Sequence, residues 1–175
     1  SIIDQHGGTI GVESEEGGGS TFWIELARVE SPNAEAERVA EGVPVSPVTK
    51  GSTVLYIEDN LSNLRLIEQV LSRRPGVRLL SAMQGRLGLE LAREHRPSLV
   101  LLDLQLPDMP GDEVLRRLRE DPRTSQIPVV VISADASPGQ VQRMLGAGAR
   151  TYLTKPIDVR EFLRILDETL LQTKG

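Results

Sequence analysis

The chain has 175 residues, of which 39% are hydrophobic and 26% charged, with no cysteine and a net charge of −5 at pH 7. This composition supports one ordinary domain with additional segments, and it excludes a disulfide scaffold and a thiolate metal site. It also argues against a nucleic-acid surface built on bulk positive charge, and no apolar stretch is long enough to cross a bilayer.

We therefore expect a cytoplasmic chain that contacts neither nucleic acid nor membrane. The chain begins at Ser1 and not at methionine, so we expect it to be a fragment. The parent protein could still carry a membrane anchor in another segment.

Residues 1–27 are glycine-rich and contain two stretches of alternating apolar residues. The pattern predicts a helix tail that ends at Gly7-Gly8, followed by strands Thr9–Glu13 and Thr21–Leu26. The glycine run at 17–19 lies between the two strands, whereas a phosphate-binding loop lies between a strand and a helix. We therefore predict a hairpin.

Residues 28–52 hold three prolines among Glu, Ala, Ser and Lys and have little to bury, which predicts a flexible linker. Residues 53–172 form the main domain, in which short apolar runs alternate with helical patterns. The runs at 99–102 and 129–132 are continuously apolar, as is typical of strands covered on both faces. We expect strands at 53–57, 77–82, 99–102, 129–133 and 151–153, and helices at 61–71, 85–94, 112–120, 138–146 and from the cap Asp158 to about Leu171, with Asp112 and Ser137 as further caps.

Five strand–helix repeats predict an α/β fold, a doubly wound five-stranded parallel sheet joined by right-handed crossovers. The flavodoxin-like strand order 2-1-3-4-5 is the one expected for this class. The N-terminal hairpin would be separate from this sheet.

Polar residues follow four of the five predicted strands. Glu58 and Asp59 follow the first, Asp103 ends the third, Ser133 ends the fourth and Lys155 follows the fifth. Each alone has an ordinary explanation as a cap, a turn residue or a solvated side chain. Together, the carboxyl ends of parallel strands bring them to one edge, where ligands bind. Such a set suits a divalent cation, Mg²⁺ in particular, and a phosphoryl group.

Residues 53–171 resemble the receiver domain of two-component response regulators. The motifs that carry the resemblance are Glu58-Asp59, Asp103 in LVLLDLQLPDMPG, Ser133 in VVVISAD and Lys155 in TYLTKP. The resemblance implies that Asp103 is the phosphoacceptor and that the donor is a phosphohistidine on a histidine kinase or histidine phosphotransfer domain.

The same resemblance implies a role for each neighbour of Asp103. Asp59 and Asp103 would ligate Mg²⁺ with the backbone carbonyl of Gln105, and Glu58 would act directly or through water. Lys155 and Ser133 would contact phosphoryl oxygens.

Three further positions matter for signalling in the resembling family. Tyr152 lies where an aromatic switch residue occurs, so it would turn inward when Ser133 moves toward the phosphoryl group. Gln105 and Asp135 border the path of the water that hydrolyses the acyl phosphate. Gln105 is long enough to obstruct this path, whereas Asp135 could orient or repel the water, so the two residues give no single indication of the lifetime. We favour a phosphoryl lifetime of minutes or longer.

The string DQHGGTIGVESEEGGGSTFWIEL resembles the C-terminal end of the ATP-binding domain of histidine kinases. The nucleotide-binding motifs of that family are absent, so this chain would not bind ATP and would act as a phosphoacceptor. The resemblance implies that the parent protein is a hybrid histidine kinase.

Three other classes of protein share parts of this pattern. A phosphatase or hydrolase with an aspartyl nucleophile usually carries a second acid two residues on, where this chain has Gln105. A flavodoxin-like cofactor module would bind a phosphate group after the first strand, where Glu58 and Asp59 would repel it. A stand-alone regulator with a DNA-binding output would need residues beyond Gly175, and we expect no such output domain.

Overall fold

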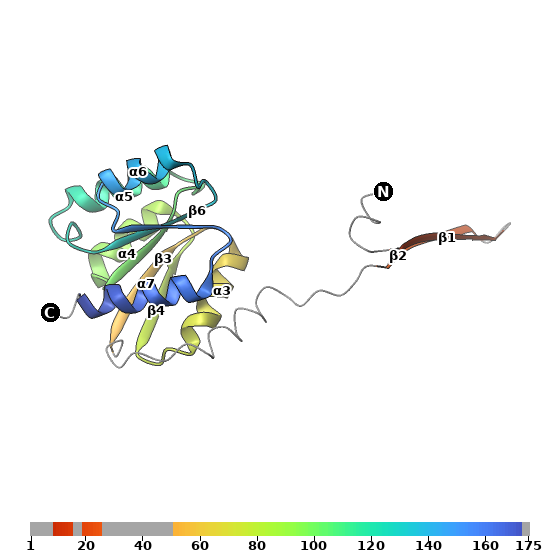
Figure 1. The fold of residues 1–175 in the computed structure, drawn as a ribbon, viewed down its shortest axis with the longest axis horizontal. Coiled ribbons are helices and arrows are strands. Elements are labelled where there is room, and N and C mark those ends of the chain that lie inside the picture. The colour runs from red at the N-terminus through yellow and green to blue at the C-terminus, as the bar shows by residue number, and fades with distance from the viewer. Residues whose placement is uncertain (1–8, 16–18, 26–50, 173–175) are drawn as a thin grey trace. The chain divides into compact units, whose positions relative to one another are not determined.

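The computed structural model describes residues 9–15, 19–25 and 51–172, and the chain divides into two compact units, residues 1–34 and 35–175 (Figure 1). The predicted helix tail at Gly7-Gly8 and nearly all of the predicted linker lie outside the described residues. Each unit is described by itself.

The first unit contains an antiparallel hairpin of β1 (Thr9–Glu15) and β2 (Gly19–Glu25). Its register pairs Ile10 with Ile24 and Val12 with Phe22. Because side chains alternate along a strand, these four lie on one face, and all four are more than half exposed. The hairpin thus presents four exposed apolar side chains on one face, which continues toward the turn with the Ser14–Ser20 pair.

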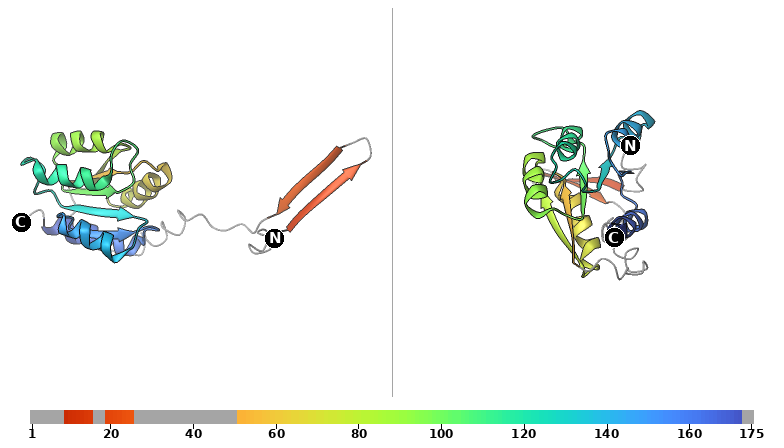
Figure 2. Two further views of the ribbon diagram at one scale, coloured as in Figure 1. Left: turned by 90° about the horizontal axis from the view of Figure 1, so that it is seen from above. Right: turned by 90° about the vertical axis from the view of Figure 1, so that its left-hand side faces the viewer.

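The second unit is a five-stranded parallel sheet with the order β4-β3-β5-β6-β7, which confirms the predicted fold class and strand order (Figures 1 and 2). Each strand is followed by a helix, and the observed bounds differ from the predicted ones by at most one residue. The strands are β3 (Ser52–Ile57), β4 (Val77–Ala82), β5 (Leu99–Asp103), β6 (Val129–Ser133) and β7 (Thr151–Thr154), and the helices are α3 (Leu61–Ser72), α4 (Gly85–His95), α5 (Gly111–Glu120), α6 (Pro138–Gly146) and α7 (Val159–Gln172).

Two hydrophobic cores lie on opposite faces of the sheet. Helices α3 and α7 cover one face, and α4, α5 and α6 cover the other (Figure 2). Central strands supply both cores in alternation: Leu101 packs toward α3 and α7, whereas Leu102 packs toward α4 and α5. The continuously apolar runs are therefore buried on both faces, as predicted.

The helix starts differ in part from the prediction. Asp158 caps α7, because its Oδ1 accepts the N–H groups of Arg160 and Glu161 at 2.8 and 3.0 Å. Ser137 stands at the cap position of α6, but its side chain makes no capping bond. The prediction of Asp112 as a cap is wrong, because α5 begins one residue earlier and Pro110 occupies the cap position.

The start of α5 lies directly against the end of β5. A Cβ added to Gly111 would lie 2.3 Å from the carbonyl oxygen of Asp103 and 2.6 Å from Cα of Leu104. The N–H of Gly111 donates to the carbonyl of Leu104 at 3.0 Å. Glycine therefore permits this close approach, which an added methyl group would prevent.

The loop between β5 and α5 is also tied to α4. Asp108 accepts the N–H of Gly85 at 2.7 Å and that of Arg86 at 2.9 Å. It thereby satisfies two unpaired donors at the start of α4 from another segment of the chain. Burial raises the pKa of Asp108, but these backbone hydrogen bonds outweigh it and lower the pKa overall.

Among the residues that the structure describes, no helix is long and apolar enough to cross a membrane.

Candidate functional site at the carboxyl edge of the sheet

The carboxyl ends of β3 and β5 bring three acids together. Glu58 and Asp59 follow β3, and Asp103 is the last residue of β5. Each of the three offers a carboxylate oxygen, and these oxygens lie within 4.8 Å of one another. The parallel sheet therefore gathers an acidic cluster at the edge where the sequence analysis expected one.

Lys155 from the end of β7 binds two of these acids. Its Nζ donates to Glu58 Oε2 at 2.8 Å and to Asp103 Oδ2 at 2.9 Å. Its backbone N–H donates to the carbonyl of Ser133 at 2.8 Å, which continues the ladder between β6 and β7. The Lys155–Pro156 peptide bond is cis. A single ammonium group is thus shared between two carboxylates.

The acids differ sharply in exposure. Glu58 is fully buried and Asp103 is 4% exposed, whereas Asp59 is exposed. Burial raises the pKa of Asp103, and Lys155 offsets this only in part, so the pKa stays above its usual value. Burial acts on Glu58 in the same direction, but hydrogen bonds from Lys155 and Tyr56 outweigh it and lower its pKa. Burial lowers the pKa of Lys155, but its two carboxylate partners raise it overall.

The charge and chemistry of this cluster fit a divalent cation. Three carboxylates face one ammonium group, so their ionised forms leave an excess of two negative charges. Carboxylate oxygens are the hard ligands that Mg²⁺ prefers, and Mg²⁺ usually binds through few protein groups and keeps several waters. Asp59 and Asp103 suit this purpose, since Asp59 is exposed and Asp103 lies beside it.

Ser133 and Tyr152 connect through the loop after β6. Ser133 is buried, and its Oγ accepts the N–H of Asp135 at 3.2 Å. The Tyr152 hydroxyl, on the edge strand β7, donates to the carbonyl of Asp135, and the Asp135 carboxylate caps the turn by accepting the N–H of Ser137 at 2.8 Å. One short loop therefore contacts both predicted switch residues.

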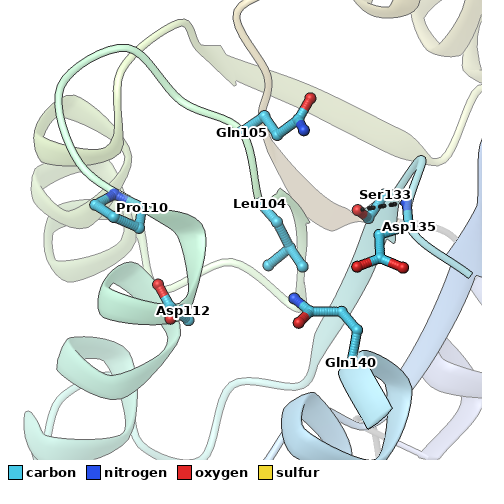
Figure 3. A pocket seen from close by; sticks show the side chains of 7 residues that line it. All are labelled: Leu104, Gln105, Pro110, Asp112, Ser133, Asp135 and Gln140. Carbon is cyan, nitrogen blue, oxygen red and sulfur yellow. Dashed lines mark hydrogen bonds between the residues drawn. The ribbon is translucent and has the colours of Figure 1, made fainter. Parts of the chain in front are cut away.

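A pocket of about 240 Å³ lies beside Ser133, between the loops that follow β5 and β6 (Figure 3). Gln105 and Asp135 project from these two loops on opposite sides of the pocket. Gln105 also donates its backbone N–H to Asp103 Oδ1 at 3.3 Å. The pocket is lined by Leu104, Gln105, Pro110, Asp112, Ser133, Asp135 and Gln140.

Tyr56 is a further residue of the site, which the sequence pattern did not single out. It is fully buried, and its hydroxyl donates to Glu58 Oε2 at 2.7 Å. The available signal was the period of two along β3, which places residues 56 and 58 on the same face.

Fold and site together define a parallel α/β protein with a lysine-bridged acidic pocket at the carboxyl edge of its sheet. The model of the response regulator receiver domain family matches residues 54–167, and the chain belongs to this family. It is thus a receiver domain of a two-component system. Receiver domains bind Mg²⁺ at such a pocket and interact with histidine kinases or phosphotransfer proteins.

Known proteins support this membership. The chain is 36% identical over 118 residues to the polar-differentiation response regulator DivK of Brucella anthropi. The aligned region covers 67% of this chain and 95% of DivK. It is similar to a CheY-like receiver domain protein of Methanospirillum hungatei (TM-score 0.64, 26% identity, 70% of this chain and 96% of the other). It also resembles the receiver domain of a sensor histidine kinase of Pseudomonas aeruginosa (TM-score 0.62, 31% identity, 69% of this chain and 98% of the other covered). That receiver domain has magnesium coordinated in its active-site cleft.

Proposed function

We propose that this domain accepts a phosphoryl group on Asp103 from a phosphohistidine of a histidine kinase or phosphotransfer domain. The observation that carries the proposal is the Lys155 ammonium group, which bridges Asp103 and Glu58 within an acidic cluster although Lys155 and Glu58 are 97 residues apart. A carboxylate held beside a fixed cation is a suitable nucleophile for phosphoryl transfer.

In the proposed reaction, a carboxylate oxygen of Asp103 forms a bond to phosphorus while the bond from phosphorus to the donor imidazole nitrogen breaks. The imidazole takes up a proton from solvent as it leaves. Lys155 stabilises negative charge on the phosphoryl oxygens, and the Ser133 hydroxyl donates a hydrogen bond to one of them. The product is an acyl phosphate on Asp103.

Mg²⁺ would be held by Asp59, Asp103 and the backbone carbonyl of Gln105, with Glu58 acting directly or through water. When bound, the ion neutralises charge on the transferring group. The magnesium in the related Pseudomonas receiver domain supports this assignment.

Incubation with acetyl phosphate and Mg²⁺ tests the proposal, with intact-mass and peptide measurements. We expect one labile phosphoryl adduct on Asp103 and none in Asp103→Asn, which should keep its fold. Stoichiometric labelling of Asp103→Asn at the wild-type rate would reject the assignment. Steady hydrolysis of small phosphate esters would favour the aspartyl phosphatase alternative.

We further propose that phosphorylation moves Ser133 and turns Tyr152 inward, which remodels the surface of α6, β7 and α7. The contacts of Ser133 and Tyr152 with the Asp135 loop support this coupling. With beryllofluoride as phosphoryl mimic, we expect NMR shifts that reach α6 and α7 and are lost in Ser133→Ala. Shifts confined to the loop after Asp103 would contradict the switch.

Gln105 and Asp135 are proposed to set the lifetime of the acyl phosphate, since they project on opposite sides of the pocket beside Ser133. We expect decay over minutes or longer, and decay within seconds would contradict this.

The hairpin is proposed to be the end of a histidine kinase ATP-binding domain, joined to the receiver by residues 28–52. Its exposed apolar face supports this proposal, because a lone hairpin is marginal in water and the rest of a larger domain would cover that face. The coding sequence upstream of Ser1 is the test. We expect a phosphoacceptor histidine and nucleotide-binding motifs there, and their absence would reject the hybrid-kinase proposal.

A further inference from the structure

Tyr56 is a tyrosine whose hydroxyl lies inside the protein, next to the acidic cluster. Its ring belongs to the core between the sheet and the helices α3 and α7, and its exposed fraction is 0%. The hydroxyl donates to Glu58 Oε2 at 2.7 Å. A buried hydroxyl requires a hydrogen-bond partner, and here that partner is a carboxylate of the site.

The Glu58 carboxylate is consequently surrounded by donors. Oε2 receives both the Tyr56 hydroxyl and the Lys155 ammonium group, at 2.7 and 2.8 Å. Oε1 receives the backbone N–H of Asn60 at 3.2 Å. Because a carboxylate oxygen has about two lone-pair sites, both sites on Oε2 are in use. A cation that bound Oε2 directly would have to displace one of these donors.

The other two acids are arranged differently. Asp59 is exposed, and Asp103 carries one hydrogen bond from Lys155 to Oδ2 and one longer bond, 3.3 Å, from Gln105 to Oδ1. Glu58 is therefore committed to protein donors, whereas Asp59 and Asp103 keep carboxylate oxygens open to a cation.

We propose that Tyr56 is a positioning residue of the phosphorylation site. Its hydroxyl holds Glu58 against Lys155, so that Glu58 fixes the ammonium group beside Asp103 and does not ligate the cation directly. This inference rests on the proposed function, in which Asp103 is phosphorylated with Mg²⁺ bound at Asp59 and Asp103. It assigns the two adjacent acids to different tasks, one to the lysine and one to the cation.

Tyr56→Phe removes the hydroxyl and keeps the ring, so the core is preserved. Without this donor, Glu58 Oε2 becomes available to a cation, and Mg²⁺ binding followed by NMR titration should tighten by about three- to tenfold, the effect of one lost hydrogen bond. In the metal-free protein, the Nζ signals of Lys155 should broaden or exchange faster. Thr124→Val is the matched control, because it removes another buried hydroxyl, one that donates to the Leu118 carbonyl at 2.8 Å outside the site, and it should leave the Mg²⁺ affinity unchanged.

The effect must pass through Glu58. In a Glu58→Gln background, Tyr56→Phe should therefore change the Mg²⁺ affinity no further. An unchanged or weaker affinity in folded Tyr56→Phe, or the same gain in the Glu58→Gln background, would overturn the proposal.

A second comparison applies even if Tyr56→Phe does not fold. Glu58→Gln alone should weaken Mg²⁺ binding much less than Asp59→Ala does, and equal losses would show that Glu58 is a direct ligand and overturn the proposal. Failure of the proposed function has a different signature: the wild-type protein itself would bind no Mg²⁺ or take no phosphoryl group on Asp103.

Discussion

Exposure separates the adjacent acids Glu58 and Asp59, which sequence alone treats as a pair. Glu58 follows β3 on the face that carries Tyr56 and is fully buried, whereas Asp59 is exposed in the loop that follows. Burial forces Glu58 to take hydrogen-bond partners from the protein, while Asp59 can exchange water for a cation.

Asp59→Ala should accordingly weaken Mg²⁺ binding by about tenfold or more, because the site has few protein ligands. Titration calorimetry with MgCl₂ measures this, and Glu94→Ala, which removes an exposed acid from the end of α4, serves as control. Wild-type affinity in Asp59→Ala would mean that the metal site is wrongly assigned.

Lys155→Gln should destabilise the metal-free domain by about 2–3 kcal/mol, since it leaves the Glu58 carboxylate buried without its cation. Urea unfolding measures the loss, and saturating Mg²⁺ should recover part of it by binding the native acids. Arg116→Gln breaks only exposed ion pairs with Glu113 and Glu120 and should cost less than about 1 kcal/mol. Equal losses in the two variants would contradict the proposed pairing.

At the scale of the elements, the loop between β5 and α5 holds two helices near the site. The start of α5 lies against the carbonyl of Asp103, and the start of α4 donates to Asp108. Both contacts hold the loop that follows Asp103, the proposed phosphoacceptor.

Gly111→Ala should destabilise the domain by about 1–3 kcal/mol, because its methyl group would meet backbone atoms that cannot move aside cheaply. Gly139→Ala in α6 is the matched control, since no heavy atom lies within 4 Å of its added Cβ, and it should be neutral or slightly stabilising. Thermal unfolding distinguishes the two, and equal melting temperatures would refute the close approach.

Asp108→Asn should cost about 0.5–1 kcal/mol at pH 7, because an amide accepts from one backbone N–H where the carboxylate accepts from two. The folded-state pKa of Asp108 is lowered, so its stabilising effect is present above the unfolded pKa and is lost as pH falls through the folded pKa. Urea unfolding at pH 7 and pH 3 should therefore show a gap between Asp108→Asn and wild type that narrows at the lower pH. A gap independent of pH would contradict the ionised cap.

The elements show which predictions sequence can support. Buried parallel strands are continuous apolar runs, so their number and ends could be predicted, whereas their order was the one expected for this class of fold. The start of α5 could not, because it depends on how closely Gly111 approaches β5. The convergence of Glu58, Asp103 and Lys155 followed from strand ends alone. The hydrogen bond between Tyr56 and Glu58 could not be predicted, because the sequence alone does not show that the Tyr56 hydroxyl is buried beside Glu58.

At the scale of the whole molecule, every residue of the candidate site lies in the second unit. We therefore expect residues 51–175 alone to bind Mg²⁺ and to accept phosphate from acetyl phosphate as the full chain does. Parallel titrations of both proteins test this. A fragment that folds but binds Mg²⁺ at least tenfold more weakly would show that the N-terminal unit contributes to the site.

The span of 97 residues between Glu58 and Lys155 also has a consequence during synthesis. Glu58 and Asp103, the proposed phosphoacceptor, leave the ribosome well before Lys155, and β7 must join the sheet before Lys155 can bridge these two acids. We expect the nascent chain not to react with phosphodonors until β7 has docked. Phosphorylation would then report that this sheet is assembled, so that signalling would not begin on partly folded domains.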